Sequence, residues 1–294
     1  MLDSMEGLAG ARKPVPTSVP TPPTYQDATS EGYRALWVTF AIMVLASIFF
    51  SYLSWKIPVS RRIYHVLTTI ITLTAALSYF AMASNHGTTY HCTKATMHHK
   101  DRPNTHYDLC RAVFWPRYVE AAITTPLILL DLCLLAGVDG AHTLMAVAAD
   151  LIMVFSGLFA ALGRERTVQR WGWYTITCIA FLFVIWHVAV HGTRAVRERS
   201  DRVGKLFGSL IAYIFILWAI YPIVWAIAGG SHRASVDAEI IAYAVLDILA
   251  KPVFGFWLLM AYRQMPETNV DVGGYWSQGL GTEGAIRIGD EEGN

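Results

Sequence analysis

Apolar residues are concentrated in seven long segments that alternate with short polar connections. A hydrocarbon layer about 30 Å thick is crossed by about 20 residues of helix, so each segment is long enough to span a bilayer. Backbone groups in lipid must be paired within their own segment, which favours helices over strands. The pattern therefore predicts an all-α membrane protein, a seven-transmembrane-helix bundle. The predicted spans are residues 35–55, 63–84, 113–135, 141–162, 171–192, 206–228 and 238–262.

The two ends of the chain differ in composition from the segments between them. Residues 1–34 are rich in Pro, Ser and Thr, which is typical of a disordered tail and not of a cleaved signal peptide. Residues 263–294 contain several glycines and an acidic run, and they predict a second flexible tail. An odd number of spans places these tails on opposite sides. Residues 35–262 are predicted to form one seven-helix domain.

The charge of the chain limits its partners. The net charge is +1 and charged residues make up 15% of the sequence, compared with roughly one quarter in soluble domains. No basic surface is available to displace phosphate counterions, so we expect a lipid bilayer and no nucleic acid as a partner. The connections at one end of the predicted bundle contain nearly as many Lys and Arg residues as those at the other end. The arginine-rich connection at residues 194–205 favours the cytoplasmic side for that face.

Ionisable residues inside spans are costly and are usually functional. In the third span, Arg117, Glu120, Thr124 and Asp131 are spaced by 3, 4 and 7 residues, which keeps them on one face of a helix. Glu120 and Asp131 are separated by roughly 16 Å along the axis at 1.5 Å per residue. One carboxyl group is thus expected near mid-membrane and the other toward the cytoplasm.

The last span contains Asp247 and Lys251, which are neighbours on one helix face. One interpretation is a structural ion pair. The other is that desolvation makes the lysine amine a nucleophile that forms a Schiff base with a carbonyl ligand. Its proton would then need a counterion, and Asp247 and Glu120 are the candidates.

Aromatic residues and one further carboxyl group complete the candidate site. Trp218, Tyr221, Pro222 and Trp225 are spaced by 3, 1 and 3 residues in the sixth span. Alone they are an ordinary packing stripe, but facing a buried lysine they become the wall of a ligand slot. Asp150 in the fourth span has no evident cation, and a structural hydrogen-bonding role there is as reasonable as a functional one.

Together these residues resemble the microbial rhodopsins. The resemblance rests on Arg117-Tyr118-Val119-Glu120, on Thr124-Thr125-Pro126-Leu127 with Asp131, and on Leu246-Asp247-Ile248-Leu249-Ala250-Lys251. The stretches at 73–83 and 240–243 are similar to the fungal branch of that family. The resemblance covers about residues 35–262 and implies a bundle that encloses retinal.

The resemblance implies a role for each candidate residue. Lys251 would bind all-trans retinal, Glu120 would be the primary proton acceptor and Asp247 the second counterion. Asp131 would be the cytoplasmic proton donor, and Arg117 would organise water. The remaining matches are to the retinal pocket or its close neighbours. These are Tyr118, Thr124, Thr125, Asp150, Met153, Gly157, Trp173, Trp218, Tyr221, Pro222 and Trp225.

The residues that release the proton in this family are matched less completely in this sequence. Glu239, at the outer end of the last span, corresponds to one member of the family's release pair. The other member has no clear counterpart, and His232 or Asp237 are the candidates. Two further residues depart from the family pattern, because Glu120 stands where aspartate is usual and Ala121 where tryptophan is usual.

The connection between the second and third spans is rich in histidine and contains two cysteines. Cys92 and Cys110 can form a disulfide if this connection faces an oxidising compartment. The histidine spacing fits no strong zinc pattern, so a polar loop is favoured over a pH or metal sensor. The weak metal candidates are His86, His91, His98, His99 and His106.

The sequence therefore predicts a retinal-binding photoreceptor, not an enzyme, that acts as a light-driven outward proton pump. The resemblance implies a multi-pass protein of the plasma membrane with its N-terminus outside and its C-terminus in the cytoplasm. Family members often form homo-oligomers, although no feature of this sequence indicates the number of protomers. Two alternatives stay open: a slow-cycling photosensor with the same parts, and a non-photoactive membrane scaffold or chaperone-like relative.

Overall fold

The structure is a computed structural model that describes residues 23–97, 105–163 and 167–265. Within this part of the chain, seven helical spans are long and apolar enough to cross a membrane. The sixth span is α6 followed by the π-helical turn η2 (Ala226–Gly230), and the seventh joins α7, the π-helical turn η3 (Leu249–Val253) and α8. The α-helices are α1 (Ser30–Trp55), α2 (Ile63–Ala83), α3 (Pro116–Ala136), α4 (Gly140–Leu162), α5 (Val168–Val196), α6 (Asp201–Trp225), α7 (Val236–Ile248) and α8 (Phe254–Gln264).

The helix boundaries follow from capping residues in the sequence. The Asp139 side chain accepts a hydrogen bond from the backbone N–H of His142 and starts α4. Ser200 and Ser235 cap α6 and α7 in the same way, and each cap satisfies an amide that has no partner inside its helix. Gly137 ends α3 in the left-handed conformation at φ 80°, which a residue with a side chain rarely adopts.

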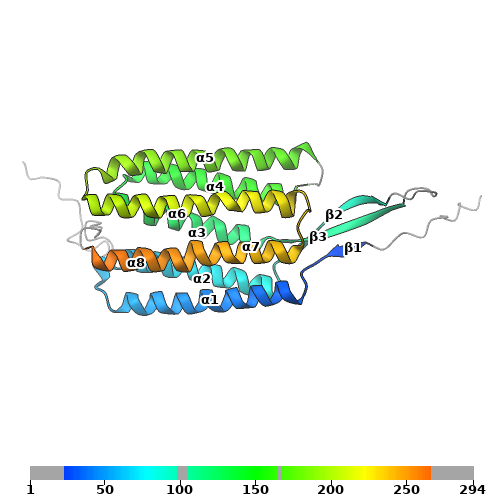
Figure 1. Cartoon of the computed structure of the whole chain (residues 1–294), viewed down its shortest axis with the longest axis horizontal. Helices are drawn as coiled ribbons and strands as arrows, with labels where there is room; N and C mark the ends of the chain where they lie inside the picture. Colours follow the sequence, from blue (N-terminus) through cyan, green and yellow to red (C-terminus); the bar gives the residue numbers. More distant parts are fainter. Residues whose placement is uncertain (1–22, 98–104, 164–166, 266–294) are drawn as a thin grey trace, which may run out of the picture.

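The helices pack side by side with α3 in a central position (Figure 1). α1 packs against α2 and α7, α4 packs against α5, and α3 contacts α2, α4, α5 and α6. Many large apolar side chains remain exposed on the outer faces, including Leu45, Leu77 and Ile179. In a bilayer such faces contact lipid, so the polar residues collect on the inner faces around α3.

The seventh span changes its helical geometry at the candidate lysine. η3 interrupts the α-helix from Leu249 to Val253, and Lys251 lies at its centre, next to Pro252. Proline has no backbone N–H, and π-helical turns insert an extra residue into a helix, frequently at functional sites. The pattern of apolar residues in the sequence does not reveal this π-helical turn.

A small sheet projects from one end of the bundle (Figure 1). Its strand order is β1-β3-β2, in which β2 and β3 are antiparallel and β1 pairs in parallel with β3. The sequence had predicted a polar connection and a disordered tail here. The structure differs, because β1 is ordered and α1 begins at Ser30 instead of residue 35. The strands are β1 (Thr24–Gln26), β2 (Thr88–Met97) and β3 (Thr105–Phe114).

Several contacts hold the segment before α1 against the rest of the molecule. The Tyr90 hydroxyl donates to Asp27 at 2.6 Å, and this hydrogen bond raises the pKa of Tyr90 to about 12. The phenol therefore stays protonated at physiological pH. Thr29 donates its backbone N–H and its hydroxyl to Asp237 at 2.8 and 2.7 Å. These contacts connect the start of the first span to the hairpin and to the seventh span.

α5 and α6 approach each other closely at Gly192. A Cβ atom there would lie 2.3 Å from the Phe207 ring, whereas a Cβ at Gly208 would meet nothing within 4 Å. Gly192 is therefore a packing requirement, and it sets how α6 and its aromatic side chains lie against α5.

We expect the two glycines to respond oppositely to alanine. Gly192→Ala should destabilise the protein by about 1–3 kcal/mol because the added methyl overpacks the contact with Phe207. Gly208→Ala should be neutral or stabilising by up to about 1 kcal/mol, since alanine favours helix. Thermal unfolding of both variants in the same detergent measures the difference, and equal behaviour would contradict the close contact.

Candidate functional site

The centre of the bundle contains a lysine between two carboxylates. Lys251 Nζ lies 2.9 Å from Glu120 Oε1 and also donates to Asp247 Oδ1. The three side chains are 2–6% exposed. Unpaired charges in such a setting would be very costly, so each ion depends on the others. The structure thus brings together the candidates that the sequence placed on two different helices.

Hydroxyl groups distinguish the two carboxylates. Asp247 accepts from Tyr79 at 2.5 Å and from Tyr221 at 2.7 Å, in addition to Lys251. Glu120 accepts from Thr124 at 3.1 Å and contacts the same lysine. Asp247 is therefore fixed by more donors than Glu120. Tyr79 was missed in the sequence analysis, because a tyrosine in an apolar span gives no signal until its partner is known.

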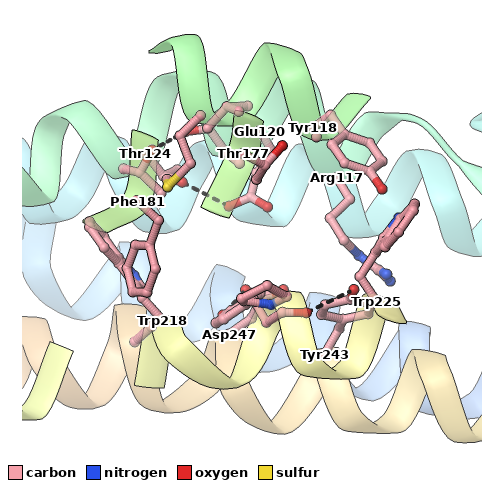
Figure 2. A pocket seen from close by; sticks show the side chains of 18 of the residues that line it. Arg117, Tyr118, Glu120, Thr124, Thr177, Phe181, Trp218, Trp225, Tyr243 and Asp247 are labelled. Carbon is pink, nitrogen blue, oxygen red and sulfur yellow. Dashed lines mark hydrogen bonds between the residues drawn. The ribbon is translucent and has the colours of Figure 1, made fainter. Parts of the chain in front are cut away.

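A cavity of about 160 Å³ begins at this triad and extends between α3, α4, α5 and α6. This is about ten times the space that one water needs. Figure 2 shows Glu120 and Asp247 facing each other across it, with Phe181 and Trp218 at one end and Tyr118 and Trp225 at the other. The predicted pocket residues that line the cavity are Tyr118, Thr124, Thr125, Met153, Gly157, Trp218, Tyr221, Pro222 and Trp225.

Two predicted pocket residues do not line the cavity. Asp150 lies behind Thr125, whose hydroxyl donates to it at 2.6 Å. The Trp173 ring packs on Phe159 at 5.0 Å between centroids and is not among the residues that line the cavity. The next residue, Tyr174, faces the cavity instead and stacks on Trp225 at 5.0 Å. Successive residues on a helix point in directions that differ by about 100°. The sequence alone did not determine which of Trp173 and Tyr174 faces the cavity.

Several lining residues were not predicted. Ala121 lines the cavity where the family pattern has a tryptophan, so the wall on that side is thinner. The others come mainly from α5, which has little polar signal in its sequence. The unpredicted lining residues include Ala121, Ile128, Tyr174, Thr177, Cys178, Phe181 and Tyr243.

Asp131 is isolated from the triad. It is 0% exposed, and neither of its carboxyl oxygens has a hydrogen-bond partner among the described residues. It lies three turns beyond Glu120 along α3, in a cluster of buried apolar side chains that includes Leu129 and Leu132. A polar group without partners is expensive to bury, which makes a purely structural role for Asp131 hard to justify.

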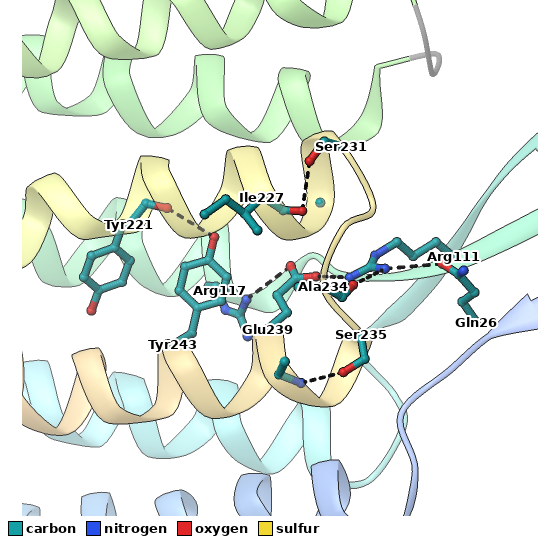
Figure 3. A network of polar contacts seen from close by, with 12 residues as sticks. Gln26, Arg111, Arg117, Tyr221, Ile227, Ser231, Ala234, Ser235, Glu239 and Tyr243 are labelled. Carbon is teal, nitrogen blue, oxygen red and sulfur yellow. Dashed lines mark hydrogen bonds and ion pairs between the residues drawn. The ribbon is translucent and has the colours of Figure 1, made fainter.

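On the other side of the triad, a second polar network runs toward the sheet. The Arg117 guanidinium lies over the Tyr243 ring at 3.9 Å, and its Nη1 atom is 3.9 Å from Glu239 Oε1. Glu239 Oε2 accepts from Arg111 Nη2 at 2.8 Å (Figure 3). Arg111 comes from β3, is 3% exposed and was not predicted. A lone arginine in a polar connection gives no sign that it folds back onto the bundle.

The two candidate partners of Glu239 lie in different places. His232 lines a small polar cavity together with Glu239. Asp237 accepts hydrogen bonds from Thr29 at the start of α1 and is not among the residues that line that cavity. Helical spacing explains the difference, since residues two apart on α7 face different directions.

The cysteine and histidine candidates are spread along the hairpin. Cys92 and Cys110 form a disulfide between directly opposed positions of β2 and β3. His86 contacts the Ser84 hydroxyl at 3.1 Å, and His91 lines the small polar cavity. His98, His99 and the His106 side chain lie outside the described residues. Within the described ranges, no group of three or more His, Cys, Asp or Glu side chains is arranged to hold a metal ion.

Comparison with known proteins identifies the family and its fold. Residues 33–265 match the family described as bacteriorhodopsin-like protein. The chain belongs to this family. The match covers all seven spans, and its members bind retinal. The chain is accordingly a multi-pass membrane protein.

Individual relatives and structures agree with this assignment. The chain is 61% identical to Opsin-1 of Neurospora crassa over 280 residues, which cover 95% of this chain and 92% of the relative. A solved structure of the light-driven proton pump LR (Mac) from Leptosphaeria maculans is 53% identical with a TM-score of 0.80, covering 84% and 100% of the two chains. The light-driven proton pump of Coccomyxa subellipsoidea is 35% identical with a TM-score of 0.71, covering 81% and 99%.

The cavity suits retinal in its chemistry. Its walls are mainly apolar and aromatic, and Lys251 is one of the residues that line it. An amine is the group that joins an aldehyde covalently. The residues present therefore fit the cofactor of the family.

The Glu120 carboxylate should influence the colour of the retinal-loaded protein. We expect Glu120→Gln to shift the absorption maximum to longer wavelength, because a negative charge 2.9 Å from the Lys251 nitrogen stabilises positive charge there in the ground state. Glu120→Asp retains the charge and serves as the control, with a smaller shift. An absorption spectrum of each variant decides, and an unchanged maximum in Glu120→Gln would show that the charge is absent.

Proposed function

We propose that this protein is a light-driven outward proton pump of the plasma membrane that binds all-trans retinal at Lys251. The observation that supports this most directly is the arrangement of carboxyl groups along one face of α3. Glu120 contacts the Lys251 amine at 2.9 Å. Asp131 is buried three turns further along α3, on the side of Glu120 that is distant from the sheet. A pump needs one group that takes a proton and another that replaces it from the opposite side.

When bound to Lys251, retinal supplies a light-driven change of shape that moves the lysine nitrogen relative to its neighbours. The residues around that nitrogen determine where its proton goes. Asp247 is held by Tyr79, Tyr221 and Lys251, so it serves as the fixed counterion. Glu120 has fewer donors and serves as the acceptor.

Asp131 acts as the proton donor in this proposal. An ionised carboxylate with no partner would be costly at 0% exposure, so the resting side chain retains its proton. Transfer toward Lys251 then restores the starting state, and a new proton enters from the cytoplasm. Glu239 and Arg117 assist release on the side of the sheet, since their ion pair connects the triad to the small polar cavity.

The orientation rests on two features at opposite ends of the bundle. The Cys92–Cys110 disulfide lies in the sheet that includes β1, at the N-terminal end of the described chain (Figure 1). Disulfides persist in oxidising environments, so this end faces outward. At the other end, the stretch from the last turn of α5 to the first turn of α6 contains Arg194, Arg197, Arg199 and Arg202. Positive charges favour the cytoplasmic side, and the two arguments agree.

Light-dependent acidification tests the proposal. Cells expressing the protein with retinal should acidify an unbuffered medium on illumination, and a protonophore should abolish the signal. Lys251→Ala is the matched control and should show neither a visible absorption band nor acidification. A coloured protein without acidification would instead support a photosensor. Absence of a visible band in the unmodified protein would support a non-photoactive scaffold.

Replacement of the proposed donor should slow one half of the cycle. Asp131→Asn should delay proton uptake from the cytoplasmic side by roughly 100-fold, which is a typical contribution of a positioned acid. A pH-indicator dye after a laser flash measures this uptake. Asp150→Asn is the control, because Asp150 is also a buried carboxyl group but lies behind Thr125. Equal uptake rates in both variants would remove Asp131 from the proton path.

A further inference from the structure

A group of buried polar atoms without partners lies toward the end of α3 that is distant from the sheet. Both carboxyl oxygens of Asp131, the Tyr64 hydroxyl and the Nη1 atom of Arg199 are buried, and none of them has a hydrogen-bond partner among the described residues. The three side chains come from α3, α2 and the connection between α5 and α6. Nearly all buried polar groups in folded proteins are paired, so three unpaired groups near one another need an explanation.

Tyr64 is the side chain that relates the other two. It belongs to the first turn of α2, is 0% exposed and lies in the same apolar cluster as Leu132 and Leu135 of α3. Its phenol interacts electrostatically with both Asp131 and Arg199. Tyr64 is therefore near the buried carboxyl group and also near a cation of the connection that follows α5.

Arg199 marks the end of the bundle from which a proton can reach this group. Its side chain lies against Gly137, where α3 ends, because a Cβ atom added to Gly137 would be 2.8 Å from Arg199 Nε. Asp131 is six residues before Gly137, which is roughly 9 Å along the axis at 1.5 Å per residue. Asp131 is therefore less than two helical turns from this end of the bundle, on the cytoplasmic side in the proposed orientation.

The neighbouring hydroxyl groups already have acceptors. Thr68, one turn after Tyr64 on α2, donates to two backbone carbonyls of the preceding turn at 2.8 and 3.1 Å. Tyr262 of α8 packs on Tyr64 at 5.1 Å between ring centroids, and its hydroxyl donates to the Arg61 carbonyl at 3.0 Å. The Tyr64 hydroxyl has no acceptor in the described part of the chain, so it is the one of these three that can turn to Asp131.

We propose that the Tyr64 hydroxyl is the relay through which Asp131 recovers its proton from the cytoplasm. The inference rests on the proposed function, since it requires that Asp131 gives up a proton in each cycle. In the resting protein Asp131 is neutral, and the phenol is not bonded to it. Once the carboxyl group has lost its proton, its negative charge attracts the phenol O–H, because hydrogen bonds to ionised groups are about twice as strong as those between neutral groups.

The relay leaves the phenol unchanged. The Tyr64 oxygen gives its proton to the Asp131 carboxylate, while a hydronium ion on the cytoplasmic side gives a proton to the same tyrosine oxygen and leaves as water. The Arg199 guanidinium stays charged and stabilises the negative charge that develops on that oxygen during the transfer. The neutral Asp131 then no longer attracts the phenol, so the path closes until the next cycle.

Time-resolved infrared spectroscopy of the retinal-loaded Tyr64→Phe variant tests the relay, because phenylalanine keeps the ring and removes only the hydroxyl. The carbonyl band of protonated Asp131 should disappear at the unmodified rate. Its return should slow by roughly 100-fold, the lower end of the contribution of a positioned proton-transfer group. Tyr262→Phe is the matched control, since it removes a neighbouring hydroxyl that is bonded to the Arg61 carbonyl, and both steps should keep their rates. An unchanged return of the band in Tyr64→Phe would overturn the relay.

A second measurement does not depend on the Tyr64 variant. Ring-deuterated tyrosine incorporated into the protein identifies the infrared bands of its phenol groups. One tyrosine band should shift while Asp131 is ionised and recover with it, and this band should be absent from Asp131→Asn, which cannot form the carboxylate. Absence of such a band in the unmodified protein would overturn the relay even if Tyr64→Phe does not fold. If Asp131 never loses its proton in the unmodified protein, its role as donor fails and the relay fails with it, whereas the other negative results leave the donor role intact.

Discussion

The structure depends on one electrostatic constraint, which is that a buried lysine in the middle of an apolar helical bundle must be paired with negative charge. Lys251 is stable there because Glu120 and Asp247 reach it from two different helices. Those carboxylates in turn require hydroxyl donors from α2 and α6. Four of the seven spans, namely α2, α3, α6 and the last, are thereby tied to one point, and the aromatic cavity lies around it. The polar interior follows from this single charge, and removing one partner would leave the others unpaired.

Much of the fold could be predicted because membranes impose simple rules. The seven spans follow from length and hydropathy, and their observed bounds differ from the expected ones by a few residues. Lys251, Asp247 and Glu120 were identifiable because charges are rare in apolar spans. Tyr79 and Tyr174 were not, since tyrosine is common in spans and its role depends on which way it points. The π-helical turn at Lys251 was also hidden, because it alters geometry without altering the hydrophobic pattern.

The outer end of the molecule was the least predictable part. Polar connections follow no periodicity that fixes their contacts, so the pairing of β1 with β3 and the return of Arg111 to Glu239 appear only in three dimensions. The sequence predicted a release group of Glu239 with His232 or Asp237, and it assigned no role to the connection that forms the sheet. The structure shows instead that Glu239 is shared between a helix residue and a strand residue. The proposed outlet is therefore built jointly by the bundle and the sheet.

The segment from Thr24 to Thr29 has a practical consequence for anyone who alters this protein. Gln26 contacts Arg111, Asp27 accepts from Tyr90, and Thr29 donates to Asp237. Each contact anchors a different element, so the segment acts as a mechanical brace across the end of the bundle that carries the sheet. A leader peptide or affinity tag joined ahead of residue 24 leaves the brace intact. A deletion that reaches Gln26 would loosen the hairpin, the seventh helix and the buried arginine at once.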